Sequence, residues 1–217
     1  MLPKEDALKA IFDVGIVAIV RLDDSSQLHA TAEAIQAGGI RAIEFTMTTP
    51  GALDMLREAA MNLDENTVLG AGTVLDAETA RAAILAGAKF IVAPNLNLDV
   101  IAIARRYSVA IIPGALTPTE IVTAWEAGAD IVKIFPASFG GAELIKSLRG
   151  PLPHIKMIPT GGVDLNTAAA FIKAGSAAVA VGGNLADKEA IKRGEFDKIT
   201  NLAKQYVEIV LQARRIV

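Results

Sequence analysis

Short apolar runs alternate with longer amphipathic stretches along the whole chain. The amphipathic stretches carry apolar residues at helical spacing, for example Ala30, Ala34 and Ile35. Several of them end in glycine, which readily adopts the left-handed conformation that terminates a helix. The apolar runs have the length of strands. The predicted strands span residues 16–21, 42–46, 67–73, 90–94, 109–114, 130–135, 156–161 and 178–183.

An Ala-Gly pair recurs at the end of four predicted helices. The glycines of these pairs, Gly38, Gly87, Gly128 and Gly175, lie 49, 41 and 47 residues apart, which is about two strand–helix units each time. Eight strands that alternate with helices predict a parallel (β/α)8 TIM barrel with an additional N-terminal helix, as one domain over residues 1–217. A doubly wound open sheet is the alternative, because the pattern alone does not establish closure.

Composition narrows the classes of protein that fit this pattern. With 217 residues, of which 52% are hydrophobic, the chain can bury one sizeable core. Its 21 basic and 24 acidic residues form no long like-charge run, which disfavours nucleic acid or a membrane surface as a partner. No apolar run reaches membrane-spanning length, and the first residues do not resemble a secretory signal, so we expect a cytoplasmic protein.

Neither cysteine nor histidine chemistry is indicated. The chain has no cysteine, which excludes disulfides, thiolate nucleophiles and cysteine-ligated metals. Its two histidines, His29 and His154, fall in a predicted helix and a predicted loop, and neither has a second ligand at metal-binding spacing. Trp125 lies late in a predicted helix, where packing is the ordinary explanation. We therefore expect no metal and no cofactor.

One lysine interrupts an otherwise apolar segment. Lys133 lies in the predicted strand 130–135, at a position where a core strand normally carries valine or leucine. An unpaired ammonium is costly in a low-dielectric interior, so burial lowers the pKa of a lysine below its ordinary value of about 10.4. The neutral amine that results is a nucleophile, which can attack a ketone and form a Schiff base.

A carboxyl group interrupts a second apolar strand. Glu44 lies in the predicted strand 42–46. Schiff-base formation and carbon–carbon cleavage both require proton transfers, and this carboxyl group is suited to perform them. The alternative is that Lys133 and Glu44 form an inert ion pair that fills the barrel interior.

Polar residues and glycines gather near the C-terminal ends of the predicted strands, where barrel enzymes carry their active sites. Each predicted strand except the fifth contributes at least one of them. In strand order they are Arg21, Glu44, Thr73, Pro94, Lys133, Thr160, Gly161, Gly162, Gly182, Gly183 and Asn184.

Two glycine pairs, at 161–162 and 182–183, follow the last two predicted strands. Backbone amides in such turns can hold a phosphate, and barrels often place a phosphate site after strands 7 and 8. Tight-turn geometry alone is the alternative for either pair. The segment 70–73, Gly-Ala-Gly-Thr, lacks the third glycine and the first-strand position of a dinucleotide fingerprint, so its threonine is better suited to face a carboxylate.

Six short motifs carry a family resemblance over nearly the whole chain. They are IEFT at 43–46, GAGTVL at 70–75, VAPN at 92–95, IPG at 112–114, VKIFPAS at 132–138 and PTGGV at 159–163. In this order and spacing they resemble the bacterial 2-keto-3-deoxy-6-phosphogluconate (KDPG) and 4-hydroxy-2-oxoglutarate (KHG) aldolases.

The resemblance implies a metal-free, homotrimeric (β/α)8 class I aldolase. By position, Lys133 matches the lysine that forms the Schiff base, Glu44 matches the catalytic glutamate, and Thr73 matches the threonine that binds the pyruvate carboxylate. The two glycine pairs match the phosphate-binding turns. We therefore predict substrate contacts at Arg21, Thr73, Pro94, Phe135, Thr160, Gly161, Gly162, Gly182, Gly183 and Asn184.

The chain departs from the family pattern at the carboxylate site. Some members have a carboxylate-binding arginine where this chain has Thr48, and Arg21 can supply the missing cation. Thr160 matches the gluconate-type enzymes, whereas the galactonate-type aldolase has valine there. Asn184 stands where serine is common among the phosphate ligands.

The expected activity is that of a lyase acting on a small phosphorylated 2-keto-4-hydroxy acid. KDPG would yield pyruvate and glyceraldehyde 3-phosphate, and KHG would yield pyruvate and glyoxylate. One alternative is a galactonate-type aldolase. Another is a phosphate-binding barrel isomerase or decarboxylase in which Lys133 acts only as an acid, and a third is a barrel used for assembly or binding.

Overall fold

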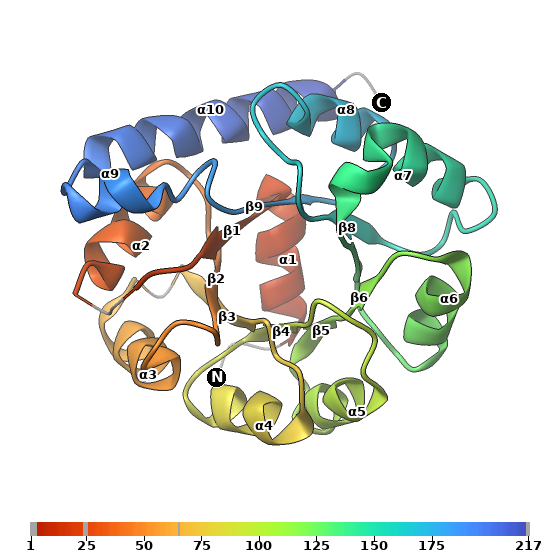
Figure 1. The fold of residues 1–217 in the computed structure, drawn as a ribbon, viewed down its shortest axis with the longest axis horizontal. Helices are drawn as coiled ribbons and strands as arrows, with labels where there is room; N and C mark the ends of the chain where they lie inside the picture. The colour runs from red at the N-terminus through yellow and green to blue at the C-terminus, as the bar shows by residue number, and fades with distance from the viewer. Residues whose placement is uncertain (1–3, 24–25, 65, 216–217) are drawn as a thin grey trace.

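The computed structural model describes residues 4–23, 26–64 and 66–215. Short strands alternate with helices along this part of the chain, as the hydrophobic pattern predicts (Figure 1). The strands are β1 (Ile16–Val20), β2 (Ala42–Thr46), β3 (Val68–Gly72), β4 (Phe90–Val92), β5 (Ala110–Ile112), β6 (Gly114–Ala115), β7 (Val132–Ile134), β8 (Met157–Pro159) and β9 (Val179–Val181). The helices are α1 (Lys4–Val14), α2 (Leu28–Ala37), α3 (Ala52–Asn62), α4 (Ala77–Leu85), α5 (Leu98–Arg106), α6 (Pro118–Glu126), η1 (Ala137–Phe139), α7 (Gly141–Arg149), α8 (Ala168–Lys173), α9 (Lys188–Lys192) and α10 (Phe196–Arg214).

The strands form a ring, and the labelled helices other than α1 lie around it, whereas α1 lies at its centre in this view (Figure 1). Six parallel strands pair in the order β5-β4-β3-β2-β1-β9, and three more pair in the order β6-β7-β8. A parallel bridge between Thr160 and Ala180 joins the end of β8 to β9. Residues 110–115 run through both sheets as β5 and β6. The ring is therefore closed, and the fold is the predicted (β/α)8 barrel with an additional N-terminal helix.

One predicted strand is divided in two. The expected strand 109–114 consists of β5, which pairs with β4, and β6, which pairs with β7. Pro113 separates the two pieces because it has no N–H to donate to a neighbouring strand. Gly114 then passes so close to the backbone of Pro94 that a Cβ at this position would overlap the Pro94 carbonyl. The break at Pro113 carries the chain from one sheet to the other.

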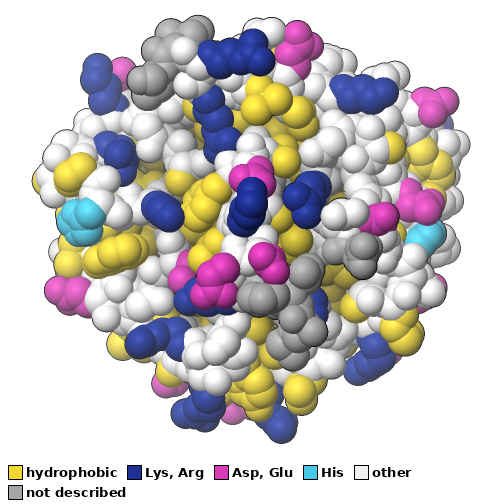
Figure 2. Space-filling model, turned by 180° about the vertical axis from the view of Figure 1, so that it is seen from behind, with side chains coloured by type: hydrophobic (Ala, Val, Ile, Leu, Met, Phe, Trp, Pro, Cys, Tyr) yellow, Lys and Arg dark blue, Asp and Glu magenta, His cyan; other side chains and the backbone are white. Residues whose placement is uncertain are grey.

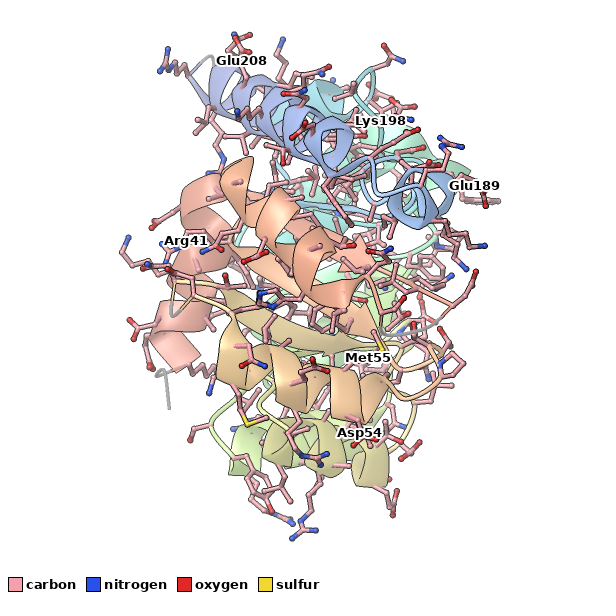
Figure 3. The ribbon with its side chains drawn as sticks, turned by 90° about the vertical axis from the view of Figure 1, so that its left-hand side faces the viewer. Arg41, Asp54, Met55, Glu189, Lys198 and Glu208 are labelled. Atoms are coloured by element: carbon pink, nitrogen blue, oxygen red, sulfur yellow. The ribbon has the colours of Figure 1, made fainter. Side chains whose placement is uncertain are left out.

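The helices bury one face against the barrel and expose the other. On α3, Met55 is buried, whereas the neighbouring Asp54 is exposed and lies on the outer side of the helix in Figure 3. The buried faces of the helices pack on the outward-facing apolar residues of the strands to form the main hydrophobic core. This packing holds the strand ends, and the side chains on them, in fixed positions.

The four Ala-Gly pairs end their helices in two ways. Three glycines have positive φ, as predicted for left-handed helix ends, namely Gly87, Gly128 and Gly175. Gly38 differs, because its φ is −81° and Gly39 takes the left-handed conformation with φ +96°. A Cβ on Gly38 would overlap the side chain of Ala203. Glycine is therefore required at position 38 by the close packing of α10 on α2.

Helix α1 closes the amino ends of the strands. Its Ala7, Ala10 and Ile11 pack against inward-facing apolar residues of the strands, such as Val17 and Phe90. Figure 2 shows the molecule from this end, where acidic and basic side chains are intermixed over the surface. Among the helices of the described residues, none combines the length and the apolar character needed to cross a bilayer.

Candidate active site

Alternation along the strands decides which side chains face the barrel interior. Ala42 and Ile131 belong to the apolar layer that α1 covers at the amino end. Side chains two positions further along a strand face the same way. In β2 and β7 those side chains are Glu44 and Lys133. The strand period therefore places both titratable groups inside the barrel, on the carboxyl side of the apolar layer.

Lys133 is almost completely buried, with 6% of its surface exposed. Its backbone N–H donates to the Pro113 carbonyl at 2.8 Å, and its Nζ lies 5.0 Å from the centre of the Phe135 ring. Burial is the largest influence on the pKa of Lys133 and lowers it; Glu44 opposes this effect, and the charge of Arg21 adds to it. The interior therefore favours the neutral, nucleophilic amine more than water does.

Glu44 is buried more deeply than Lys133, with 2% of its surface exposed. Its carboxyl group fills the space over Gly72, because a Cβ on Gly72 would overlap Oε1. Burial raises the pKa of Glu44, and the charges of Lys133 and Arg21 oppose this rise. The carboxyl group is therefore displaced toward its protonated form, in which it can donate a proton.

Lys133 and Glu44 do not fill the barrel as an ion pair. Each affects the pKa of the other through its charge, but neither side chain makes a hydrogen bond or a salt bridge within the described ranges. Burial displaces both groups toward their neutral forms. An amine and a carboxylic acid in these forms are suited to nucleophilic attack and proton donation, so the geometry favours the chemical interpretation over the inert pair.

Arg21 stands at the carboxyl end of β1 with an exposed side chain. Its charge lowers the pKa of both Lys133 and Glu44, so it lies within electrostatic range of both groups. Thr48, at the position of the family arginine, is also exposed, and its Oγ1 donates to Thr46 Oγ1 at 3.3 Å. The arrangement supports Arg21 as the cation that faces a substrate carboxylate.

Thr73 and Pro94 lie at the same end of the barrel. Thr73 follows the glycine under the Glu44 carboxyl group and has φ +57°, which is unfavourable for a β-branched residue. Strain of this kind costs on the order of 1–3 kcal/mol and clusters at functional sites. Neither residue lines the main cavity, so a direct substrate contact of Thr73 or Pro94 stays a prediction.

A cavity of about 480 Å³ opens at the carboxyl end of the barrel. Phe135 lines it and connects it to Lys133, whose amine lies over the Phe135 ring. The buried Oγ1 of Thr160 has no hydrogen-bond partner among the described residues, so this hydroxyl is available to a ligand. The predicted contacts that line the cavity are Arg21, Phe135, Thr160, Gly161, Gly162, Gly182, Gly183 and Asn184.

Both glycine turns border this cavity. Gly161 and Gly162 have φ +85° and +74°, a conformation that favours glycine. A Cβ on Gly183 would meet nothing within 4 Å, so the space beside this turn is open. Within the part of the chain that the structure describes, the amides of these three glycines donate to no acceptor. Unpaired amides that converge on a cavity are suited to an anion such as phosphate.

The side chain of Asn184 connects the two glycine turns through a hydrogen bond. Its Nδ2 donates to the Val163 carbonyl at 2.8 Å, which links the turn after β9 to the turn after β8. The side chain also lines the cavity, so a phosphate contact stays a prediction. This hydrogen bond joins residues far apart in the sequence, so no local sequence pattern predicts it.

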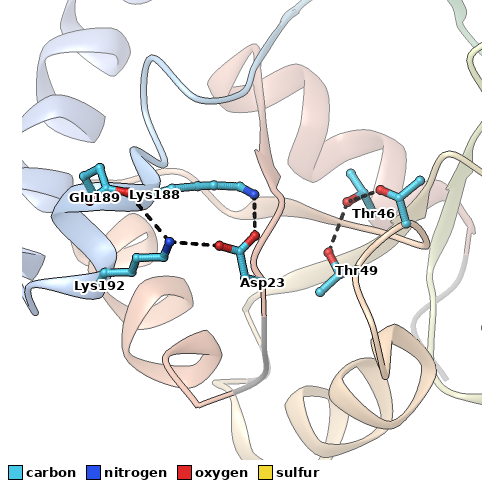
Figure 4. A network of polar contacts seen from close by, with 7 residues as sticks. Asp23, Thr46, Thr49, Lys188, Glu189 and Lys192 are labelled. Atoms are coloured by element: carbon cyan, nitrogen blue, oxygen red, sulfur yellow. Dashed lines mark hydrogen bonds and ion pairs between the residues drawn. The ribbon is translucent and has the colours of Figure 1, made fainter.

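Sequence reasoning missed two charged residues that line the cavity, Asp187 and Lys188. The Asp187 carboxylate accepts the Ala190 amide at 2.8 Å and caps α9. Lys188 contacts Asp23, which lies beyond β1 (Figure 4). The sequence indicates these two cavity residues only by an acidic residue followed by a basic residue, shortly after the second glycine pair.

Both histidines lie apart from this cavity. His29 Nε2 lies 3.2 Å from Glu33 on the surface of α2. The His154 ring packs edge-on against Trp125 with 5.8 Å between the ring centres, and Trp125 is 38% exposed. No group of three or more His, Cys, Asp or Glu side chains among the described residues is arranged to hold a metal ion.

Known proteins share both the sequence and the fold. The family model of KDPG and KHG aldolase matches residues 8–202. The chain is 36% identical to the 2-dehydro-3-deoxy-phosphogluconate aldolase of Treponema pallidum, over 94% of this chain and 96% of that protein. The native structure of KDPGal is 30% identical, with TM-score 0.85 over 92% of this chain and 96% of that one. KDPG aldolase from Legionella pneumophila, with pyruvate captured as a covalent carbinolamine intermediate, is 27% identical, with TM-score 0.83 over 89% and 95%.

Proposed function

The chain belongs to the KDPG and KHG aldolase family, and from that premise we propose how its residues carry out the reaction. The protein is a class I aldolase, a lyase that reversibly cleaves KDPG to pyruvate and glyceraldehyde 3-phosphate or KHG to pyruvate and glyoxylate. One observation carries the residue assignment. Lys133 and Glu44 are both buried, and each affects the pKa of the other through its charge, yet they form no ion pair in the described structure.

In the first half of the reaction Lys133 acts as the nucleophile. Its neutral amine attacks C2 of the substrate, and an N–C bond forms as the carbonyl electrons move to oxygen. One proton passes from nitrogen to this oxygen. Glu44 then donates a second proton to the hydroxyl, which leaves as water while the nitrogen lone pair forms the C=N bond of the iminium.

In the second half Glu44 acts as a base. Its carboxylate takes the proton of the C4 hydroxyl, the electrons of the broken O–H bond form the second bond of the aldehyde carbonyl, and the C3–C4 bond breaks. The iminium accepts the electron pair of that bond and becomes an enamine. Protonation of the enamine at C3 and hydrolysis of the C=N bond release pyruvate and regenerate the Lys133 amine.

The cavity supports an orientation for the substrate. We assign the pyruvate carboxylate to Arg21 and Thr73, because a guanidinium can bind a carboxylate through two parallel hydrogen bonds. The phosphate is assigned to the glycine turns, with their unpaired amides. The unpartnered hydroxyl of Thr160 lines the same cavity, directly before the first glycine turn.

Borohydride trapping tests the assignment of Lys133. Incubation with pyruvate followed by reduction is expected to add one pyruvate-derived group to Lys133, mapped by peptide mass spectrometry. The Lys133→Met variant should show no adduct. Lys156→Met is a matched control, because Lys156 also lies over an aromatic ring, that of Phe12, but at the amino end of the barrel.

The same experiment separates the alternatives. An isomerase or decarboxylase that uses Lys133 only as an acid gives no reducible adduct with pyruvate, and an adduct on another lysine contradicts the assignment. If the barrel serves only in assembly, the Lys133→Met variant should keep every measurable activity of the wild type.

We also propose a homotrimer, on the basis of family membership. Light scattering that reports a mass other than that of three chains contradicts this proposal.

A further inference from the structure

Two lysines share one carboxylate at the mouth of the cavity. Asp23 lies just beyond β1, and its Oδ1 is 2.6 Å from Lys188 Nζ. Its Oδ2 is 3.0 Å from Lys192 Nζ, one turn further along α9. Figure 4 shows the two ammonium groups approaching Asp23 from the same helix. This cluster carries one net positive charge and ties α9 to the end of the first strand.

The two lysines differ in what else they face. Lys188 lines the same cavity as the two glycine turns, whereas Lys192 does not. Lys192 has a second carboxylate nearby, that of Glu189 at 3.7 Å. The Asp187 carboxylate, which also lines the cavity, is engaged with the Ala190 amide at the start of α9. Lys188 is therefore the ammonium of this cluster that an anion in the cavity can recruit.

This inference rests on the proposed function, because it concerns the phosphate of the aldolase substrate. We propose that Lys188 determines the preference for phosphorylated substrates, and that its ammonium moves from Asp23 to the substrate phosphate when the cavity is filled. Lys192 stays with Asp23, so the carboxylate is never left without a partner.

The charges favour this exchange. A phosphate monoester carries about −1.5 to −2 charges at pH 7, more than a carboxylate, and its oxygens accept charge-assisted hydrogen bonds. The Lys188 and Asp23 side chains are 44% and 52% exposed, and ion pairs this exposed are weak. A shared, exposed carboxylate thus holds the ammonium near the phosphate end of the cavity without binding it tightly.

The test compares KDPG with the unphosphorylated KHG. In Lys188→Met, kcat/KM for KDPG should fall about tenfold, mainly through KM, since one partly exposed charge-assisted contact is lost. The change for KHG should be less than about twofold, because KHG has no phosphate and its second carboxylate, attached directly to C4, ends short of the position of the KDPG phosphate on C6. Lys188→Arg should restore most of the KDPG activity. Lys198→Met is the matched control, since it removes the same charge from α10, where Lys198 lies 4.0 Å from Glu195 and outside the cavity.

The Asp23→Asn variant distinguishes two roles for Lys188, namely phosphate binding and a purely structural ion pair with Asp23. If Asp23 competes with the phosphate for Lys188, its removal lowers KM for KDPG, by about twofold. A purely structural pair predicts losses in the same direction for Asp23→Asn and Lys188→Met, and that result overturns the proposal. Equal losses on KDPG and KHG in Lys188→Met also overturn it. A wild-type protein that cleaves neither substrate refutes the proposed function itself, so the two failures are distinguishable.

Discussion

The two ends of the barrel differ in where they place charged side chains. At the amino end, Lys4 Nζ lies 2.6 Å from Asp130, and Lys156 Nζ lies 4.3 Å from an aromatic ring of α1. Both lysines have a partner at the edge of an apolar layer. At the carboxyl end, Lys133 and Glu44 lie deep in the interior and make no direct contact with a counter-ion in the described structure.

The difference shows how the barrel divides stability from chemistry. Apolar side chains from α1 and from the starts of the strands form a closed layer at the amino end, and burial of such surface stabilises the fold. The carboxyl end holds Lys133 and Glu44, whose charged forms are disfavoured by burial, and Thr73, whose backbone is in the left-handed conformation. These features destabilise the fold. Active sites commonly retain destabilising residues of this kind because the reaction depends on them.

Lys133→Met should have the largest effect, and its two consequences have opposite signs. Cleavage should be lost completely, because no other group in the proposed mechanism can form the Schiff base. The pKa of Lys133 is lower in the folded protein than its ordinary value of 10.5, so below that pH the unfolded chain holds the proton more tightly and folding is disfavoured.

Removal of this group should therefore raise the free energy of unfolding at pH 7 by about 1–3 kcal/mol, and the gain should shrink as the pH approaches the ordinary value. Turnover assays and denaturant unfolding at several pH values measure both effects. A variant that is inactive and also less stable would show that the buried Lys133 does not destabilise the fold. That result would contradict the proposed difference between the two ends of the barrel.

Glu44→Gln should have the next largest effect. Loss of the proton donor and acceptor should reduce cleavage by about 10²–10⁴-fold while slow adduct formation with pyruvate persists. Glu44 raises the pKa of Lys133 through its charge, so the amide should shift the pH midpoint of adduct formation downward.

The measurement is borohydride-trapped adduct as a function of pH, beside steady-state cleavage. Glu33→Gln is a suitable control, because Glu33 is an exposed carboxylate that contacts His29 on the surface of α2. Unchanged cleavage in Glu44→Gln removes this residue from the mechanism, and an upward shift of the midpoint contradicts the electrostatic coupling.

Lys4→Met should have a smaller effect than either of these substitutions and should act on stability alone. The ion pair with Asp130 is partly buried, with the two side chains 25% and 13% exposed, so its loss should cost about 0.5–1 kcal/mol of unfolding free energy. Cleavage should stay within about twofold of the wild type, because the apolar layer separates this pair from the site.

Lys9→Met, which breaks the more exposed pair with Asp13, should change the unfolding free energy less than Lys4→Met. Denaturant midpoints and steady-state assays of both variants provide the comparison. A tenfold loss of cleavage in Lys4→Met would show that the two ends are coupled and that the division between them is wrong.

Much of the fold follows from local patterns. The apolar run 42–46 matches β2 residue for residue, and the predicted strand 16–21 differs from β1 only at its last position. The period of two also explains why Glu44 and Lys133 face inward with the apolar layer. The hydrophobicity of the fifth strand continues across Pro113 and predicts one piece, whereas pairing depends on the N–H that Pro113 lacks.

The sequence by itself determined the order of the elements, the inward direction of Lys133 and Glu44, and the glycines at the two turns, because these follow from periodicity and backbone conformation. Only the tertiary structure decided that the amine and the carboxyl group lie in electrostatic range without pairing, and that Asp23 meets Lys188 across 165 positions of the chain. The reason is physical, since the free energy of a charge depends on its solvent exposure and on distances in space. Neither quantity is contained in the spacing of residues along the chain.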